Sequence, residues 1–100
     1  MYQGTTPTHV FTLPFDVSKI KELKITYEQS GKEVLSKKKA DCTLDGKTAT
    51  VVLTQDDTFK FEQYTPLNIQ VRVLTMNGEA LSSDIITVQV SRALDSEVLE

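Results

Sequence analysis

Hydrophobic and polar residues alternate with a period of two along most of this chain. Leu67 to Val73 alternate without exception, and Ile86 to Val90 repeat the pattern. Such alternation is typical of a strand that buries one face and exposes the other. Between these segments, Met76-Asn77-Gly78-Glu79 tolerates the positive φ of a tight turn, so an antiparallel hairpin is predicted. Its second arm is expected to begin near Ala80, with a bulge or kink at 82–84.

A second hairpin is predicted upstream. The segments 20–29 and 32–38 are expected to be strands, and Ser30-Gly31 between them is a turn signal. On the second arm, either Val34 or Leu35 faces inward. The lysines that end this arm, Lys37-Lys38-Lys39, are expected to keep an exposed sheet edge solvated.

Another hairpin and a first strand complete the predicted sheets. Asp45-Gly46 is the turn signal of this hairpin. Its first arm contains Cys42 and Leu44, which share one parity, and its second arm runs through residues 49–53. Thr8 to Leu13 is predicted as the first strand, which stops at Pro14 because proline cannot donate a ladder hydrogen bond.

The core is predicted from the parity within each strand. Residues of one parity face inward together, because successive side chains of a strand point to opposite faces. The set expected to face inward consists of Leu23, Ile25, Val51, Leu53, Ile69, Val71, Val73, Ile86, Val88 and Val90.

Only the segment Thr54 to Phe61 favours a helix, of one or two turns near residues 55–60. Thr54 and Asp57 have the spacing of a capping box, and acidic residues stabilise a helix N-terminus. Phe59, with Phe61 or Tyr64 as further candidates, is expected to fold back over one end of the core. Six to eight short strands and almost no helix predict an all-β protein, an antiparallel sandwich or a small barrel.

Composition narrows the function classes. One hundred residues correspond to one domain, expected over 1–98, and the formal net charge of -3 argues against nucleic acid and anionic membranes as partners. A single thiol, Cys42, cannot close an intrachain disulfide.

The N-terminal segment lacks the basic and apolar regions of a secretory signal, so synthesis in a reducing cytoplasm is expected. The closing Leu99-Glu100 is either an expression-tag remnant or native sequence.

The residue types that most often carry chemistry are scarce and separated. His9 has no second histidine or acidic pair at ligand spacing, and it is interpreted as a strand-packing residue. Cys42 is interpreted as a small buried hydrophobe, and Asp56-Asp57 as helix-capping residues. No catalytic, cofactor-binding or metal-binding residue is assigned, and neither a cofactor nor an enzymatic activity is expected.

The aromatic residues leave one binding function open. An exposed stacking patch for sugar rings would need aromatic side chains on the surface, but the four phenylalanines are expected to belong to the core of so small a domain. These residues are Phe11, Phe15, Phe59 and Phe61.

Three stretches carry a resemblance to a known family: residues 4–16 (GTTPTHVFTLPFD), 53–61 (LTQDDTFKF) and 69–80 (IQVRVLTMNGEA). They resemble a family of small, functionally uncharacterised proteins encoded in phages and prophages of Gram-positive bacteria. The layout is also similar to the immunoglobulin-like N-terminal domain of phage baseplate upper proteins. The chain departs from antibody-type domains, because it has no Trp and no cysteine pair across the sheets.

The resemblance implies an immunoglobulin-like β-sandwich without catalysis, a structural or interaction module associated with a phage tail or baseplate. The implied partners are other phage structural proteins, and the implied final location is the virion. The alternative is a carbohydrate-binding or cell-surface-binding β-sandwich module. Residues 32–38 and 8–13 are predicted to be edge strands that a partner chain extends.

Overall fold

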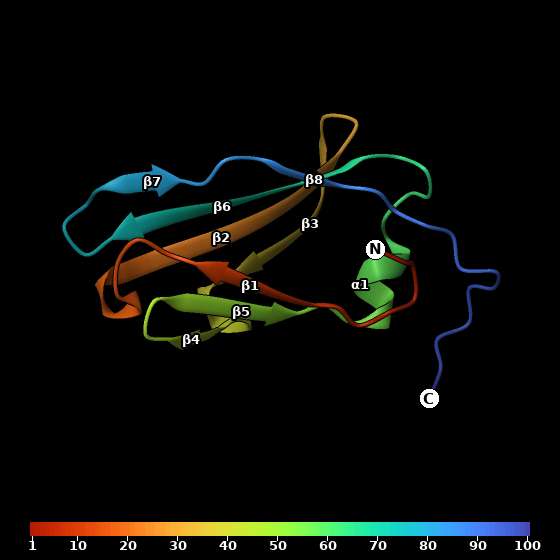
Figure 1. Cartoon of the computed structure of the whole chain (residues 1–100), viewed down its shortest axis with the longest axis horizontal. Coiled ribbons are helices and arrows are strands. Elements are labelled where there is room, and N and C mark those ends of the chain that lie inside the picture. The colour runs from red at the N-terminus through yellow and green to blue at the C-terminus, as the bar shows by residue number, and fades with distance from the viewer.

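The computed structural model describes residues 1–100 and contains two antiparallel sheets that pack face to face (Figure 1). One sheet has three strands in the order β1-β5-β4, and the other has five, in the order β3-β2-β6-β7 with β8 also paired to β6. The elements are β1 (Thr8–Thr12), β2 (Ile20–Gln29), β3 (Lys32–Lys38), β4 (Thr43–Asp45), β5 (Thr48–Val52), α1 (Gln55–Phe59), β6 (Leu67–Thr75), β7 (Ala80–Ser82) and β8 (Ile86–Val88), with 3-10 turns at Val17–Lys19 and Lys39–Asp41.

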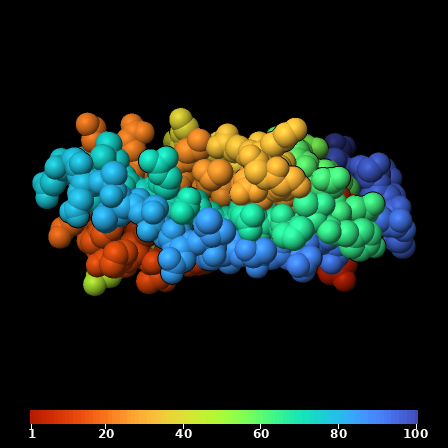
Figure 2. Space-filling view, turned by 90° about the horizontal axis from the view of Figure 1, so that it is seen from above, coloured from red at the N-terminus to blue at the C-terminus, as the bar shows by residue number.

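The three predicted hairpins are confirmed. Ser30 and Gly31 have φ of 54° and 79° between β2 and β3, and Gly46 and Gly78 also adopt positive φ in the turns before β5 and β7. The predicted interruption of the last arm is confirmed as well, because residues 83–85 separate β7 from β8. Figure 2 shows the arm of β7 at one end of the long axis and the C-terminal residues at the other, in a molecule that measures 46 × 30 × 16 Å.

The core lies between the sheets, and most of the predicted inward residues belong to it. Leu35, and not Val34, is the buried residue of β3, where it pairs with Tyr27. One position corrects the prediction: Ile86 is 49% exposed. Val88 is half-buried and packs against the core, as expected. Both have the expected parity, but β8 is an outer strand of the five-stranded sheet. Ile86, at the start of β8, is the residue that lies outside the core.

The predicted helical turn is also confirmed. Thr54 caps α1 and forms a reciprocal capping box with Asp57. Phe61 behind the helix is fully buried and covers one end of the core as expected. Phe59 is half-buried, and its ring lies against Gly4 instead of the core cluster. Tyr64, the third candidate for this role, is instead 74% exposed.

The strand order defines the fold class. In immunoglobulin variable domains, strands B, E and D lie in one sheet and strands C′, C, F and G in the other. The order β1-β5-β4 reproduces B-E-D, and β3-β2-β6-β7 reproduces C′-C-F-G. The protein is therefore an all-β, antiparallel, immunoglobulin-like sandwich, and the alternative of a small barrel is excluded. No strand takes the place of A beside β1, so β1 lies at an open edge.

Candidate interaction surfaces

His9 points between the sheets, where its imidazole is held by a core tyrosine. Its Nδ1 atom lies 2.7 Å from the Tyr27 hydroxyl, and the two rings stack with centroids 5.8 Å apart. Burial, together with the positive N-terminus, lowers the pKa of His9 below its ordinary value of 6.5. The side chain thus packs a strand, as predicted, and favours the neutral form.

Cys42 is half-buried, and its environment disfavours a thiolate. Burial and the charge of Asp41 raise the pKa of the Cys42 thiol, while Lys37 opposes the rise. The thiol donates to the backbone carbonyl of Lys38, with a sulfur-to-oxygen distance of 3.5 Å. Since nucleophilic cysteines need a lowered pKa, these contacts agree with the predicted packing role.

Asp57 joins the helix cap to β3. Its Oδ2 atom accepts from the backbone N–H of Thr54 at 3.0 Å and lies 3.0 Å from Nζ of Lys37. Burial alone raises the pKa of Asp57, but the Thr54 hydrogen bonds and the charge of Lys37 outweigh it and leave the pKa lowered. The predicted capping role of Asp57 is confirmed. Asp56 is exposed and has no side-chain hydrogen bond.

No three His, Cys, Asp or Glu side chains lie close enough together to hold a metal ion. The structure also has no helix with the length and apolar character needed to cross a membrane.

The outer edge of β1 presents unpaired backbone groups. The N–H of Leu13 donates to the carbonyl of Lys47 at 2.7 Å, and the N–H of Leu53 donates to the carbonyl of Pro7 at 3.0 Å. These two hydrogen bonds continue the β1–β5 ladder at both ends. Hydrogen-bonded pairs alternate along an antiparallel ladder. His9 and Phe11 therefore direct their backbone groups toward β5, and the residues between and beside them direct theirs away.

Those outward residues are Thr8, Val10 and Thr12. Strand β1 pairs only with β5, and no backbone hydrogen bond outside the sheets involves any of the three. Their side chains are also exposed, with Val10 at 59% and its neighbour Val52 at 56%. The edge is thus bordered by uncharged, mostly β-branched side chains that leave a second strand room to pair.

β3 is confirmed as the other predicted edge, but its end is blocked. The backbone N–H of Lys38 donates to Oδ2 of Asp41 at 2.9 Å, and the carbonyl of Lys38 accepts from the Cys42 thiol. Lysine side chains also border this edge, which discourages pairing with another chain. Of the two predicted edges, β1 is the one open to strand addition.

Tyr64 is exposed on a loop that a buried glutamine holds. Gln29, only 4% exposed at the end of β2, donates to the carbonyls of Glu62 and Thr65 and accepts from the N–H of Glu62. Tyr64 within this loop adopts φ of 59°, which is strained for an aromatic residue, and its N–H donates to Val90. Because Gln29 reaches residues more than thirty positions away, the sequence alone offered no signal for this arrangement.

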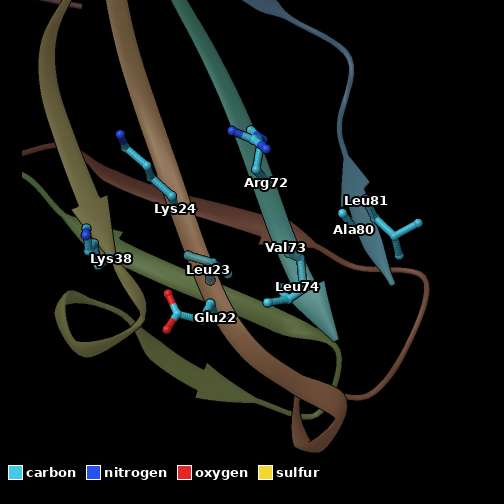
Figure 3. A pocket seen from close by; sticks show the side chains of 9 residues that line it. All are labelled: Glu22, Leu23, Lys24, Lys38, Arg72, Val73, Leu74, Ala80 and Leu81. Atoms are coloured by element: carbon cyan, nitrogen blue, oxygen red, sulfur yellow. The ribbon is translucent and has the colours of Figure 1, made fainter. Parts of the chain in front are cut away.

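A hollow of about 260 Å³ lies on the outer face of the five-stranded sheet (Figure 3). Lys38, Lys24 and Arg72 stand directly opposite one another on β3, β2 and β6, and we call them the cationic row. Leu74 and Leu81 also line the hollow. The sequence places these residues far apart, and only the strand register brings the three cations together.

Comparisons with known proteins add little to this description. No family model matches the chain, and no curated protein matches it either. Among solved structures, the V domain of amphioxus IgVJ-C2 is similar, with 12% identity over 91% of this chain and 95% of that chain and a TM-score of 0.38. The fold assignment rests on the strand order and not on this likeness.

Proposed function

We propose that this protein is a non-catalytic assembly module of a phage or prophage particle, associated with its tail or baseplate. In this role a strand of another structural protein pairs with the outer edge of β1. The observation that carries the proposal is the row of unpaired backbone groups at Thr8, Val10 and Thr12. Strand addition uses such groups for affinity and the neighbouring side chains for specificity. The choice of a phage or prophage particle as the assembly rests on the resemblance to phage proteins.

A proline at position 10 tests this proposal. Val10→Pro removes an N–H that points away from β5, so the β1–β5 ladder stays intact while the open edge loses a donor. Val10→Ala removes side-chain atoms but keeps the donor, and it serves as the matched control. We expect the wild type and Val10→Ala to be found in purified particles by mass spectrometry, and Val10→Pro to be depleted.

Two results would contradict the proposal. The first is absence of the wild-type chain from purified or induced particles. The second is equal incorporation of Val10→Pro and the wild type, provided that both have the same thermal stability. Cross-links confined to the middle of a sheet face, far from Thr8–Thr12, would also count against pairing at this edge.

Binding to a carbohydrate or cell surface is the second candidate, and the display of Tyr64 favours it. An exposed aromatic ring held in a strained backbone conformation is a suitable platform for a sugar ring. The wild type is then expected to sediment with purified host cell walls, and Tyr64→Ala is expected to remain in solution. Equal sedimentation of the two proteins would exclude this use of Tyr64.

A further inference from the structure

The cationic row concentrates positive charge that the protein neutralises at only one of its three positions. Lys24 is the direct cross-strand partner of both Lys38 and Arg72, and like charges in such positions repel one another. Only Lys24 has an ion-pair partner, Glu33, at 2.8 Å between two exposed side chains. Lys38 and Arg72 are exposed and form no ion pair. In a chain of net charge -3, this row is a place where an added anionic group relieves repulsion.

The hollow around the cationic row also has an apolar part. Leu74 and Ala80 are cross-strand partners on the same face as Arg72, and both line the hollow. In Figure 3, Leu81 stands on β7 with its side chain directed away from the cations. Glu22 is the one acid in the lining and forms no ion pair. A matching ligand therefore combines acidic groups with an aliphatic side chain, and it tolerates one acid in the hollow.

A segment of this chain has that composition. Residues Leu94–Glu97, here called the acidic loop, combine Leu94, which is 90% exposed, with Asp95 and Glu97. Arg92 lies just before the loop, and its positive charge is opposite to that of Glu22 in the hollow. The acidic loop is thus complementary to the hollow in charge and in its apolar side chain.

The acidic loop is held in place on both sides. Before it, the N–H of Ala93 donates to Oε1 of Gln3 at 3.2 Å. After it, the side-chain amide of Gln55 exchanges two hydrogen bonds with the backbone of Leu99, both of 2.8 Å. Within it, the N–H of Glu97 donates to Oδ1 of Asp95 at 3.0 Å. Since the loop is already ordered, docking it costs little conformational entropy.

The acidic loop and the hollow lie toward opposite ends of the molecule. Figure 1 shows β7, which borders the hollow, at one end of the long axis and the C-terminus at the other. The loop cannot reach the hollow of its own molecule while it is held there, but it can enter that of a neighbour.

We propose that the hollow with the cationic row binds the acidic loop of a second copy of this chain, which joins copies head to tail. Contacts of this kind use two different surfaces, so they build open chains or closed rings. The inference deepens the proposed assembly role, on which its biological meaning rests, but it uses surfaces other than the β1 edge.

Charge reversal tests the contact by sedimentation velocity on the full chain at low salt. The hollow variant is Lys38→Glu with Arg72→Glu, and the loop variant is Asp95→Lys with Glu97→Lys. We expect the wild type to associate as its concentration rises. Each variant alone is expected to associate at least about tenfold more weakly. An equimolar mixture of the two variants is expected to regain association, because each then meets a surface of opposite charge.

Controls separate this contact from general charge effects and from strand addition. Lys32→Glu with Lys47→Glu changes the net charge as much as the hollow variant does, at exposed lysines outside the hollow, and should associate like the wild type. Val10→Pro should also self-associate normally, even where it fails to enter particles. High salt is expected to weaken association, because it screens exposed charges.

The contact is refuted if the wild type stays monomeric at all concentrations or if the mixture of the two variants fails to regain association. The hollow would then serve another acidic partner or none. Neither result would affect the β1 proposal, which is judged by the incorporation of Val10→Pro into particles.

Discussion

Replacing Gln29 by leucine is expected to destabilise the protein much more than a change of one surface side chain. The Gln29 amide makes three hydrogen bonds with the loop at 62–65, of 3.0 Å to the carbonyl of Glu62, 3.1 Å to the carbonyl of Thr65 and 2.8 Å from the N–H of Glu62. Gln29→Leu keeps a similar volume and removes all three. The loop is left with two carbonyls and one N–H that have lost a partner.

The size of the effect follows from these bonds. Each buried hydrogen bond contributes about 1 kcal/mol, and burial of the leucine side chain offsets part of the loss, so a destabilisation of about 2–3 kcal/mol is expected. For a domain of 100 residues, 1 kcal/mol corresponds to roughly 4–8 °C in Tm. Gln29→Leu should therefore melt roughly 8–24 °C below the wild type.

Urea denaturation and calorimetry measure the two quantities. Gln70→Leu is the matched control, because Gln70 makes a single exposed side-chain hydrogen bond, to the carbonyl of Ser83. It should change the free energy of unfolding by less than about 0.5 kcal/mol. If Gln29→Leu also stays within about 1 kcal/mol of the wild type, water replaces the amide and the loop is not held as described.

Three further changes probe other parts of the structure. Tyr64→Gly relieves a φ of 59° and removes a mostly exposed side chain, so urea denaturation should show up to about 1 kcal/mol of added stability; a loss would contradict the strain. Gly4→Ala should lower Tm, because its Cβ would lie 2.7 Å from Cζ of Phe59 at φ +75°; an unchanged Tm would contradict this close approach. The lowered pKa of Asp57 stabilises the fold above the unfolded value near 3.8, and this stability is lost as pH falls through the folded pKa. Asp57→Asn, which also loses the charge partner of Lys37, should therefore be less stable than the wild type at neutral pH and should approach it toward pH 2 in urea titrations.

Much of the fold was predictable from local patterns. Alternation along Leu67–Val73, turn signals such as Asp45-Gly46 and the capping pair Thr54 and Asp57 each act within a few residues. Backbone φ preferences and side-chain parity are properties of the segment itself, so they survive into the fold. The order of the strands within the two sheets did not follow from these patterns.

The sequence by itself determined the strands, their turns, the inward parity of most core residues and the absence of a cysteine pair. Only the tertiary structure decided that β1 is the open edge, that Gln29 holds the loop of Tyr64, and that Lys38, Lys24 and Arg72 form one row. The tertiary structure also leaves Ile86 exposed, although its parity is correct, because it lies on a short outer strand that pairs only with β6. The physical reason is that parity is set by a strand's own backbone, whereas edges, cover and cross-strand neighbours depend on which distant strands pair and in what register.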